Sequence, residues 1–505
     1  MSMTHESSLL NPELHDSLDA LLRFLQQAAH DGLPLHEVEH AIWKRILGLG
    51  RQVLQSFLTM VGTGDQGETL SLPDGSTVQR LEKLHSRRYV SVFGEFVLPR
   101  TVYGCREGQK IEWVPLDNRL QLPESVFSHL LQDWDQSLCV EQAFRQVSVT
   151  LARILGLKQS VDSLESMNQQ MAEAASPYRI NRPVPPAAEE GEVFVASADG
   201  KGIVMRRSAD DPAPSAHRTK GEKASCKRMA TVGAVYSVDR YVRTPEEVVA
   251  ALFRDPREPE AKPAARPQPQ HKQVWASLPQ EGAEKAASTG MNAVYVWMLW
   301  ELCRRNLHQE KESVYLHDGQ ESLWEACQRY LPQKNSVGIL DLLHVTPRLW
   351  QAAHLFHGEK SQEAETFVRE RILRVLQGDV LLVVRGLRVM GTKRGLKAAA
   401  RKSLETICGY LERNAERMAY DRYLAAGYPI ASGVIEGACR HVVKDRMERA
   451  GMHWSRQGAE AMLELRSLFV SDAWESFQTY RIEREKNRLY PHRELVEGSQ
   501  FILAA

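Results

Sequence analysis

The chain has 505 residues and a mass of 57.2 kDa, more than one ordinary hydrophobic core holds, so we expect several domains. Hydrophobic residues make up 43% and charged residues 25%, as in globular proteins, and no apolar run approaches the roughly 18 residues of a membrane-spanning helix. Lysine plus arginine and aspartate plus glutamate both number 64, which excludes a uniformly basic DNA-binding protein.

The N-terminus has no basic segment followed by an apolar one, so it does not resemble a secretory signal, and we expect the protein to stay inside the cell. Seven cysteines are widely scattered and form no CxxC pair. They indicate reduced thiols rather than a disulfide framework or a zinc ribbon.

Apolar residues at helical spacing from residue 12 to 60 predict two or more amphipathic helices. The alternating Val, Phe and Tyr of RRYVSVFGEFVLPRTVYGC predict a small β element at about 87–115. We therefore interpret residues 1–118 as a helical and small-β N-terminal region.

The segment EQAFRQVSVTLARILGLKQSVDSLESMNQQMA predicts a helix, a turn at Gly156 and a second helix with Ser160 as its N-cap. This outline fits a DNA-binding helix-turn-helix within residues 119–178, with residues 158–170 as the DNA-reading part. Any two short helices around a glycine give the same pattern. Four prolines in SPYRINRPVPPAAEEGE indicate a linker at 179–191.

Short apolar runs at 193–200, 229–238, 313–319 and 336–344 alternate with helical segments and predict an α/β domain. The stretch 254–273 is rich in proline and charge and is predicted to be a surface loop. Residues 345–428 have a helical pattern, and a capped helix is expected near Ser432. The predicted domain segments are 192–344, 345–428 and 429–475, followed by a C-terminal tail at 476–505.

Three acidic residues are candidates for metal binding. Asp199 and Asp318 each follow a strand-like apolar run, and Glu436 lies in the first turn of the helix near Ser432. Taken singly, an Asp-Gly pair often starts a turn and a first-turn glutamate often compensates the helix dipole. Together, three carboxylates from separate elements provide the hard oxygen ligands that a pair of divalent ions needs.

The blocks ASADGKG, YLHDGQESLWEA, ILDLLHVTPRLWQAAH and PIASGVIEGACRHVVKDRMERAGMHWS resemble the signature blocks of ISKra-type insertion-sequence transposases. The resemblance covers roughly 190–470, and VYGCREGQ and PLDNRLQLP also resemble the N-terminal region of that family. It implies the DDE group, with an RNase H-like α/β core at 192–344 and 429–475 that is interrupted by a mostly helical insertion at 345–428.

The resemblance further implies an acidic triad of Asp199, Asp318 and Glu436 that binds Mg²⁺ or Mn²⁺ as two ions. The implied reaction is cleavage at insertion-sequence ends and strand transfer into target DNA, by a homodimer or higher oligomer in the bacterial cytoplasm. Asp341 in ILDLLH is the alternative second acid, because it too ends an apolar run. We prefer Asp318 because the family pattern places its DG block there.

Basic residues near these acids are candidates for phosphate contacts, since lysine and arginine neutralise DNA phosphates. The candidates are Lys201, Arg206 and Arg207 after Asp199, His344, and Arg440, His441, Lys444 and Arg449 after Glu436, with Trp454 as a base-stacking residue. A second basic cluster spans 388–402. Alternatives are a solvated helix face paired with Asp445 and Glu448, a structural His344 and a buried Trp454.

Two other functions fit parts of the pattern. One is a domesticated transposase that binds specific DNA sequences without cutting, although none of the three acids is missing. The other is an RNase H-like nuclease, for which the helical insertion and separate N-terminal region are unnecessary. A zinc site from His317, His344, His354 and His357 is disfavoured because no cysteine stands at ligand spacing.

Overall fold

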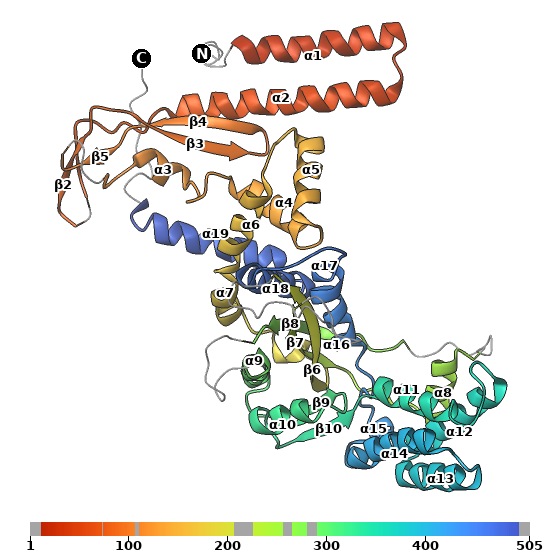
Figure 1. Cartoon of the computed structure of the whole chain (residues 1–505). Helices are drawn as coiled ribbons and strands as arrows, with labels where there is room; N and C mark the ends of the chain where they lie inside the picture. Colours follow the sequence, from red (N-terminus) through yellow and green to blue (C-terminus); the bar gives the residue numbers. More distant parts are fainter. Residues whose placement is uncertain are drawn as a thin grey trace, which may run out of the picture. The chain divides into compact units, whose positions relative to one another are not determined.

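The computed structural model describes residues 12–72, 74–106, 111–206, 226–255, 265–279 and 290–493. The chain forms two compact units, one from Met1–Met171 with Glu475–Ala505 and the other from Ala172–Trp474 (Figure 1). In the described ranges, no helix has the length and apolar character needed to cross a bilayer.

The first unit combines a helical hairpin, small sheets and a helical cluster. Its helices are α1 (Pro12–Asp31), α2 (Leu35–Val61), α3 (Pro115–Leu120), α4 (His129–Cys139), α5 (Phe144–Leu155), α6 (Val161–Ala172) and α19 (Trp474–Leu489). Its strands are β1 (Thr69–Ser71), β2 (Thr77–Arg80), β3 (His85–Ser91), β4 (Gly94–Arg100) and β5 (Tyr103–Gly104). The predicted N-terminal helices and small β element are confirmed.

The predicted helix, turn at Gly156 and second helix are present as α5 and α6. Gly156 ends α5 at a φ of 71°, the left-handed region that favours glycine, and Ser160 Oγ accepts a hydrogen bond of 3.1 Å from Ser163 N. Helix α6 contains Asp162 and Glu165 but neither lysine nor arginine. Its role in reading DNA stays a prediction.

The second unit contains the predicted α/β domain. Its strands are β6 (Val193–Met205), β7 (Cys226–Val238), β8 (Gln270–Ser277), β9 (Glu312–His317) and β10 (Ser336–Leu340). Its helices before β10 are α7 (Ala175–Asn181), α8 (Pro245–Phe253), α9 (Gly290–Arg305) and α10 (Glu321–Tyr330). The expected helical segment follows as α11 (Leu342–Ala353), α12 (Gln362–Leu376), α13 (Val380–Lys393), α14 (Ala398–Arg413) and α15 (Tyr420–Ala425). The last elements are α16 (Gly433–Ala438), the π-helical η3 (Cys439–Lys444), α17 (Asp445–Met447) and α18 (Arg456–Val470). Short 3₁₀ turns lie at Ala187–Glu189 and Ala415–Arg417.

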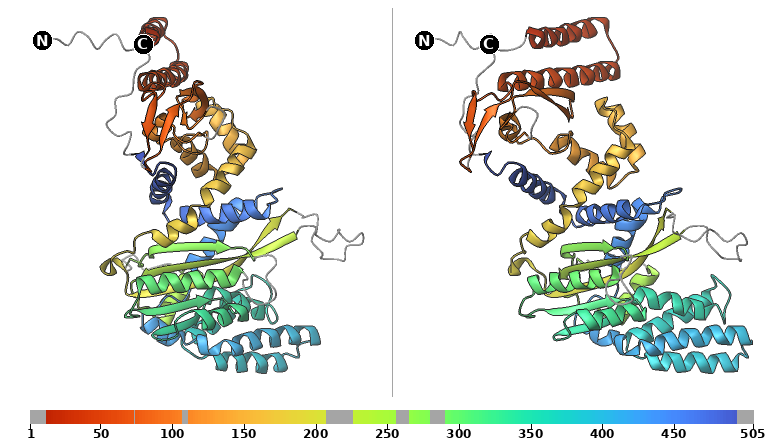
Figure 2. Two further views of the ribbon diagram at one scale, coloured as in Figure 1. Left: turned by 90° about the vertical axis from the view of Figure 1, so that its left-hand side faces the viewer. Right: turned by 60° about the vertical axis from the view of Figure 1, so that its left-hand side comes forward.

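The five strands form one mixed sheet in the order β10-β9-β6-β7-β8. Strands β6, β7 and β8 are antiparallel, whereas β9 runs parallel to β6 and β10 parallel to β9. Helices cover both faces of this sheet (Figure 2). Val193 and Val195 pack against α11–α15, and Phe194 and Ala196 pack against α9 and α10. Burial on both faces explains why β6 begins with an uninterrupted apolar run.

The prediction that residues 254–273 form a surface loop is wrong for the last residues of that range, because β8 begins at Gln270. The sequence QHKQ has no apolar residue, since β8 is an edge strand with β7 as its neighbour. Its backbone is also held by α18 and the residue after it, where Ser471 Oγ accepts a hydrogen bond of 2.9 Å from Val274 N. Residues 256–264 of the predicted loop lie outside the described residues.

A buried ion network fixes the entry of the chain into β6. Arg305 of α9 donates to Glu190 at 2.7 Å and lies 3.4 Å from Glu301, while Arg182 donates to Glu301 at 2.6 Å. The side chains of Arg305, Glu190 and Glu301 are buried. Charges withdrawn from water in this way are stable only while they remain paired.

We predict that Arg305→Met lowers the free energy of unfolding by about 3–5 kcal/mol, because it leaves two buried carboxylates without their shared cation. Chemical unfolding of the full chain measures the change. The control Arg329→Met, on the exposed side of α10, is expected to stay within about 0.5 kcal/mol of the unmodified chain. Equal effects of the two substitutions would contradict the network's role.

Candidate active site

Two of the candidate acids lie side by side because β9 and β10 are parallel and in register. His317 pairs with Leu340 at the end of the two strands, and the next residues are Asp318 and Asp341. The amide of Asp341 donates to the carbonyl oxygen of His317 at 2.8 Å, which continues the pairing by one residue. Both carboxylates therefore start from the same edge of the sheet.

Asp199 joins this edge from β6. The register of β6 and β9 runs to the pair Ala196↔Tyr315, and Asp199 and Asp318 each follow this pair by three residues. The expectation that Asp199 ends its strand is wrong, because β6 continues to Met205 in a long antiparallel pairing with β7. The pairing with β9 stops before Asp199, so the strand is open on the side where Asp318 lies.

His317 links the two strands just below the acids. Its Nδ1 accepts a hydrogen bond of 3.1 Å from the amide of Ala198, and its Nε2 lies 3.4 Å from the hydroxyl of Tyr295. Burial lowers the pKa of His317 to about 4, so the ring is neutral at physiological pH. The ring thereby tethers the residue before Asp199 to the residue before Asp318, a role that no sequence pattern indicated.

Asp341, His344 and Glu436 form the candidate metal-ligand cluster of the described residues. One ligand atom from each lies within 4.8 Å of the others. Asp341 caps α11 by accepting a 2.8 Å hydrogen bond from Leu343 N, and its side chain is buried. The disfavoured zinc site is absent from the described residues, where this cluster is the metal-ligand group that the structure brings together.

Ser432 connects the cluster to the centre of the sheet. Its amide donates to Asp341 Oδ2 at 3.2 Å, and its hydroxyl lies 3.2 Å from the hydroxyl of Ser197 on β6. The sequence predicted Ser432 as a side-chain cap of the next helix, but its side chain makes no capping hydrogen bond. The helix does begin after Ser432 as predicted, but the buried hydroxyl of Ser432 contacts Ser197 instead of capping the helix.

Cys439 contacts Asp199 from the segment that carries Glu436. Its Sγ lies 3.6 Å from Asp199 Oδ2, and burial, followed by the charge of Asp199, holds the pKa of this thiol well above its usual range. Instead of the single helix expected after Ser432, the structure has three successive segments: α16, the π-helical η3 and α17. Arg449 lies after the end of α17. The wider π turn occurs where the segment passes the acids, as is frequent at functional sites. None of the six cysteines with described side chains forms a disulfide.

The pKa of the Asp341 carboxyl is raised to about 6, mainly by burial. Hydrogen bonds from the amides of Leu343 and Ser432 and the nearby His344 oppose this rise, and the negative charge of Glu436 adds to it. Two carboxylates held this close repel each other, so the site favours a bound proton or cation.

The surroundings of Asp318 differ from those of Asp341. Asp318 Oδ1 accepts from the amide of Gln320 at 2.8 Å, as in an ordinary turn, and its carbonyl accepts from the indole of Trp324 at 2.7 Å. The ring of Tyr410, from α14, lies against Gly319. Burial raises the pKa of Tyr410 to about 12, and the charge of Asp318 contributes. Helix α14 of the helical segment at 345–428 therefore packs next to Asp318 through Tyr410.

Most of the predicted DNA-contacting residues already have a partner within the chain. Lys201 Nζ lies 3.6 Å from Glu448. Asp445 is the common partner of three candidates: Arg440 lies 3.4 Å and His441 3.0 Å from its carboxylate, and Arg449 Nε donates to its carbonyl. Arg206 Nε donates to the carbonyl of His453. Arg206, Arg440, His441, Lys444 and Arg449 are exposed, Lys201 and His344 are half-buried, and Arg207 lies outside the described residues. The intrachain pairing that sequence analysis left open is thus present.

Trp454 is buried rather than free to stack on a base. It is 7% exposed, its indole donates to the carbonyl of Met447 at 3.2 Å, and its backbone pairs with Met205 at the end of β6. The sequence makes Trp454 a candidate for stacking on a base, although burial is the usual state of a tryptophan. The tertiary structure supports burial, because the chain after α17 returns to the long β6–β7 pair.

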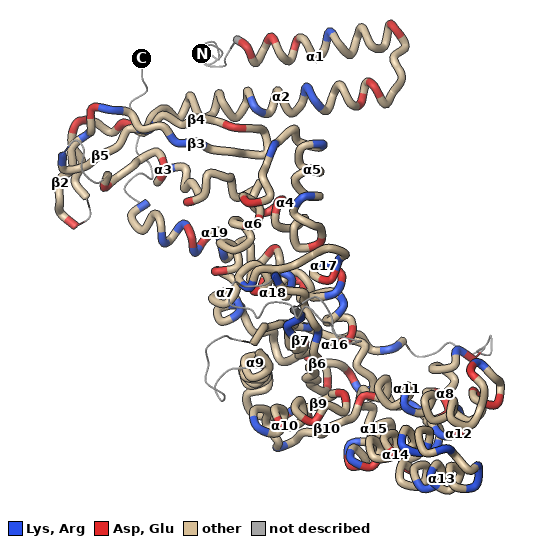
Figure 3. Tube along the Cα trace, viewed as in Figure 1, with Lys and Arg blue, Asp and Glu red and all other residues tan. Residues whose placement is uncertain are grey.

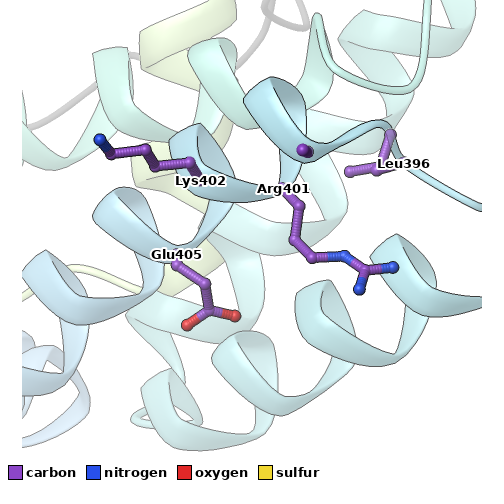
Figure 4. Close-up of a pocket in the computed structure, with 5 residues that line it drawn as sticks. Leu396, Arg401, Lys402 and Glu405 are labelled. Carbon is purple, nitrogen blue, oxygen red and sulfur yellow. The ribbon is translucent and has the colours of Figure 1, made fainter.

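The second basic cluster lies at the turn between α13 and α14. Lys393, Arg394, Lys397, Arg401 and Lys402 are all exposed there. Arg388, further along α13, is paired with Glu405 and Glu412 instead. Figure 3 shows the charges along the trace, and Figure 4 shows the hollow that Leu396, Ala398, Arg401, Lys402 and Glu405 line.

Comparisons with known proteins give little. No protein-family model matches the chain, and no curated protein matches it. Among solved structures, a Drosophila P element transposase strand transfer complex is similar with a TM-score of 0.24 and 9% identity, over 74% of this chain and 88% of that chain. A score this low does not establish a shared fold.

We predict a pH-dependent effect of Asp341→Asn in the metal-free chain. The pKa of Asp341 is raised from 3.8 to about 6, so its stabilising contribution is complete below pH 3.8 and is lost as the pH rises through about 6. The substitution is therefore expected to raise the free energy of unfolding by up to about 3 kcal/mol at pH 8 and not at pH 4. Unfolding with a chelator at both pH values tests this, with the exposed Asp16→Asn as control. An effect of equal size at both pH values would contradict it.

We also predict that Gly319→Ala destabilises the chain by about 1–3 kcal/mol, because a Cβ there would lie 2.6 Å from the hydroxyl oxygen of Tyr410. In a Tyr410→Ala background the same substitution is expected to cost less than about 0.5 kcal/mol, which a double-mutant cycle measures. Gly358→Ala is the control, since nothing lies within 4 Å of its Cβ position. Additive costs in the cycle would rule out the contact.

Proposed function

We propose that this chain is a DDE-type transposase that cuts DNA at insertion-sequence ends and joins the freed ends to target DNA. The observation that carries the proposal is the alignment of Asp199, Asp318 and Asp341 at one sheet edge, with Glu436 brought to Asp341 from a distant helix. Asp341 and Glu436 meet within 4.8 Å, whereas Asp318 follows the neighbouring strand and Asp199 contacts Cys439 of the glutamate-bearing segment, and acidic groups gathered in this way are typical of functional sites.

The order of the elements supports an RNase H-like interpretation of the second unit. Two acids belong to neighbouring parallel strands, a run of helices from α11 to α15 follows, and the glutamate-bearing α16 comes last. This is the chain order that the resemblance to ISKra-type transposases implies.

The residues present fit divalent metal ions. Carboxylate oxygens are the ligands that Mg²⁺ and Mn²⁺ prefer, and ligand atoms of Asp341, His344 and Glu436 already lie within 4.8 Å of one another. We propose Asp199, Asp318 and Glu436 as ligands, with Asp341 as the alternative to Asp318. When bound, two such ions would lower the pKa of the attacking water and stabilise the leaving oxygen.

The proposed chemistry has two steps. Water attacks a phosphodiester at the element end, a P–O bond breaks, and a 3′-hydroxyl is released. That hydroxyl then attacks a phosphodiester of the target, forming one P–O bond as another breaks. The buried Ser432 and His317 hold the acidic residues in place during both steps, and no covalent protein intermediate is needed.

Exposed cations beside the site are the proposed phosphate contacts. Arg440, His441 and Arg449 surround the half-buried Asp445, and Lys444 is exposed next to it. An exposed ion pair is worth only about 0–1 kcal/mol, so DNA phosphates displace such partners at little cost. DNA is therefore the partner that we propose.

The test is cleavage of labelled DNA carrying the flanking element ends, in Mg²⁺ or Mn²⁺, by the unmodified chain and by single variants. Asp199→Asn, Asp318→Asn and Glu436→Gln are expected to lower the cleavage rate at least about a hundredfold, because each removes a metal ligand, and to keep DNA binding. The control is Glu321→Gln, an exposed acid three residues after Asp318, which is expected to cleave normally.

Other outcomes have definite meanings. Loss of cleavage in Asp341→Asn instead of Asp318→Asn would move the second ligand to Asp341. Cleavage without any joined product would favour an RNase H-like nuclease. Binding of the ends without cleavage in any metal would overturn the enzyme proposal and leave a DNA-binding protein.

A further inference from the structure

The helical hairpin α1–α2 leaves many apolar side chains uncovered. Between residues 13 and 61 the buried side chains are those of Ala28, Ser56 and Val61. Eight large apolar side chains in the same range are 44–81% exposed, namely Leu18, Leu22, Leu35, Trp43, Ile46, Val53, Phe57 and Met60. Contiguous apolar surface of this extent marks an interaction site.

Five of the six exposed large apolar residues of α2, together with the half-buried Ile42, fall on one side of the helix, and the exposed Trp43 lies beside this line. Leu35, Ile42, Ile46, Val53, Phe57 and Met60 recur at steps of seven, four, seven, four and three residues, which keeps them in one line at 3.6 residues per turn. We call this line the α2 stripe. At about 1.5 Å per residue it runs for about 39 Å. Glu39 is the charged residue within it.

Other sides of α2 make the contacts within the first unit. Leu54 and Leu58 pack with Val61 against β4, and the guanidinium of Arg45 lies 3.8 Å from the ring centre of Phe24 on α1. Two further contacts border the α2 stripe: the ring of Phe93 lies against Gly50, and the indole of Trp43 donates to the carbonyl of Ile154 at 2.7 Å. The side chains of the stripe itself stay mostly uncovered. Its first half forms a groove lined by Leu35, Val38, Glu39, Ile42, Trp43 and Ile46.

We propose that a second copy of this chain covers the α2 stripe, with the two α2 helices antiparallel about a two-fold axis. The stripe is self-complementary, because Leu35 and Met60 are equally far from its midpoint, as are Ile42 and Val53. A two-fold interface requires such a surface, since the same patch serves both partners. About the same midpoint, Ile46 lies opposite Leu49 and Phe57 opposite Val38, so each apolar residue of the stripe faces an apolar residue of the other copy.

The size of the surface fits a dimer. A strip about 39 Å long and about 10 Å wide covers roughly 400 Å² on each α2. Leu18 and Leu22 of α1 extend the surface, so two hairpins packed as a four-helix bundle approach the roughly 800 Å² per partner of a standard interface.

The charges disfavour DNA or an anionic membrane as the occupant. No lysine or arginine belongs to the α2 stripe, and Arg51 is turned away, donating to the carbonyl of Glu95 at 2.9 Å. The exposed polar side of α1 carries Asp16 and Asp19, which repel phosphates.

The experiment is the mass of the full chain in solution without DNA, by light scattering at micromolar concentration. The unmodified chain is expected to have twice the 57.2 kDa of one copy. Val53→Glu with Phe57→Glu is expected to raise the dissociation constant at least about a hundredfold, because four carboxylates would be buried in the seam. The control adds the same charges on another side of α2, as Gln55→Glu with Thr59→Glu, and is expected to stay dimeric.

A disulfide tests the orientation. Leu35→Cys with Met60→Cys is expected to give an oxidised dimer between chains, whereas either substitution alone gives only the background of the native cysteines. A monomeric unmodified chain, or a dimer that survives Val53→Glu with Phe57→Glu, would overturn the proposal. Dissociation of the control, or a crosslink as strong with Leu35→Cys alone, would overturn the antiparallel arrangement. No DNA is used, so failure here leaves the proposed activity untouched.

Discussion

The candidate site depends on the parallel, in-register pairing of β6, β9 and β10. Strands β9 and β10 end together because their backbone hydrogen bonds fix a common offset, and β6 loses its pairing with β9 just before Asp199. A shift of one residue would turn each acid to the other face of its strand, so the register and the chemistry are inseparable. His317 adds a side-chain link where the ladder ends.

Burial determines how the acids differ. Asp341 is held by two backbone amides and pressed toward Glu436, which raises its pKa, whereas Asp318 sits in a turn beneath Tyr410. The carboxylates of Asp341 and Glu436 repel each other, and a bound cation would reduce this repulsion. Ser432 helps to position Glu436, because its hydroxyl contacts Ser197 and so joins the glutamate-bearing segment to β6.

The two units differ in how much apolar surface they bury. The second has large hydrophobic cores on both faces of its sheet. The first contains a hairpin that buries almost nothing of its own, which is the surface we assign to a second copy. The acidic cluster and the uncovered hairpin thus belong to different units of the chain.

Local sequence patterns were enough to predict the N-terminal helices, the strands of the α/β unit except β8, and the acids after apolar runs. These follow from side-chain periodicity and turn residues, which act over a few positions. Four features required the folded chain: the pairing of β8 at an edge despite its polar start, the contact of Ser432 with Ser197, the burial of Trp454 and the contact of Cys439 with Asp199. Those contacts join residues up to 240 positions apart, and no local pattern records which distant atoms will share a buried space.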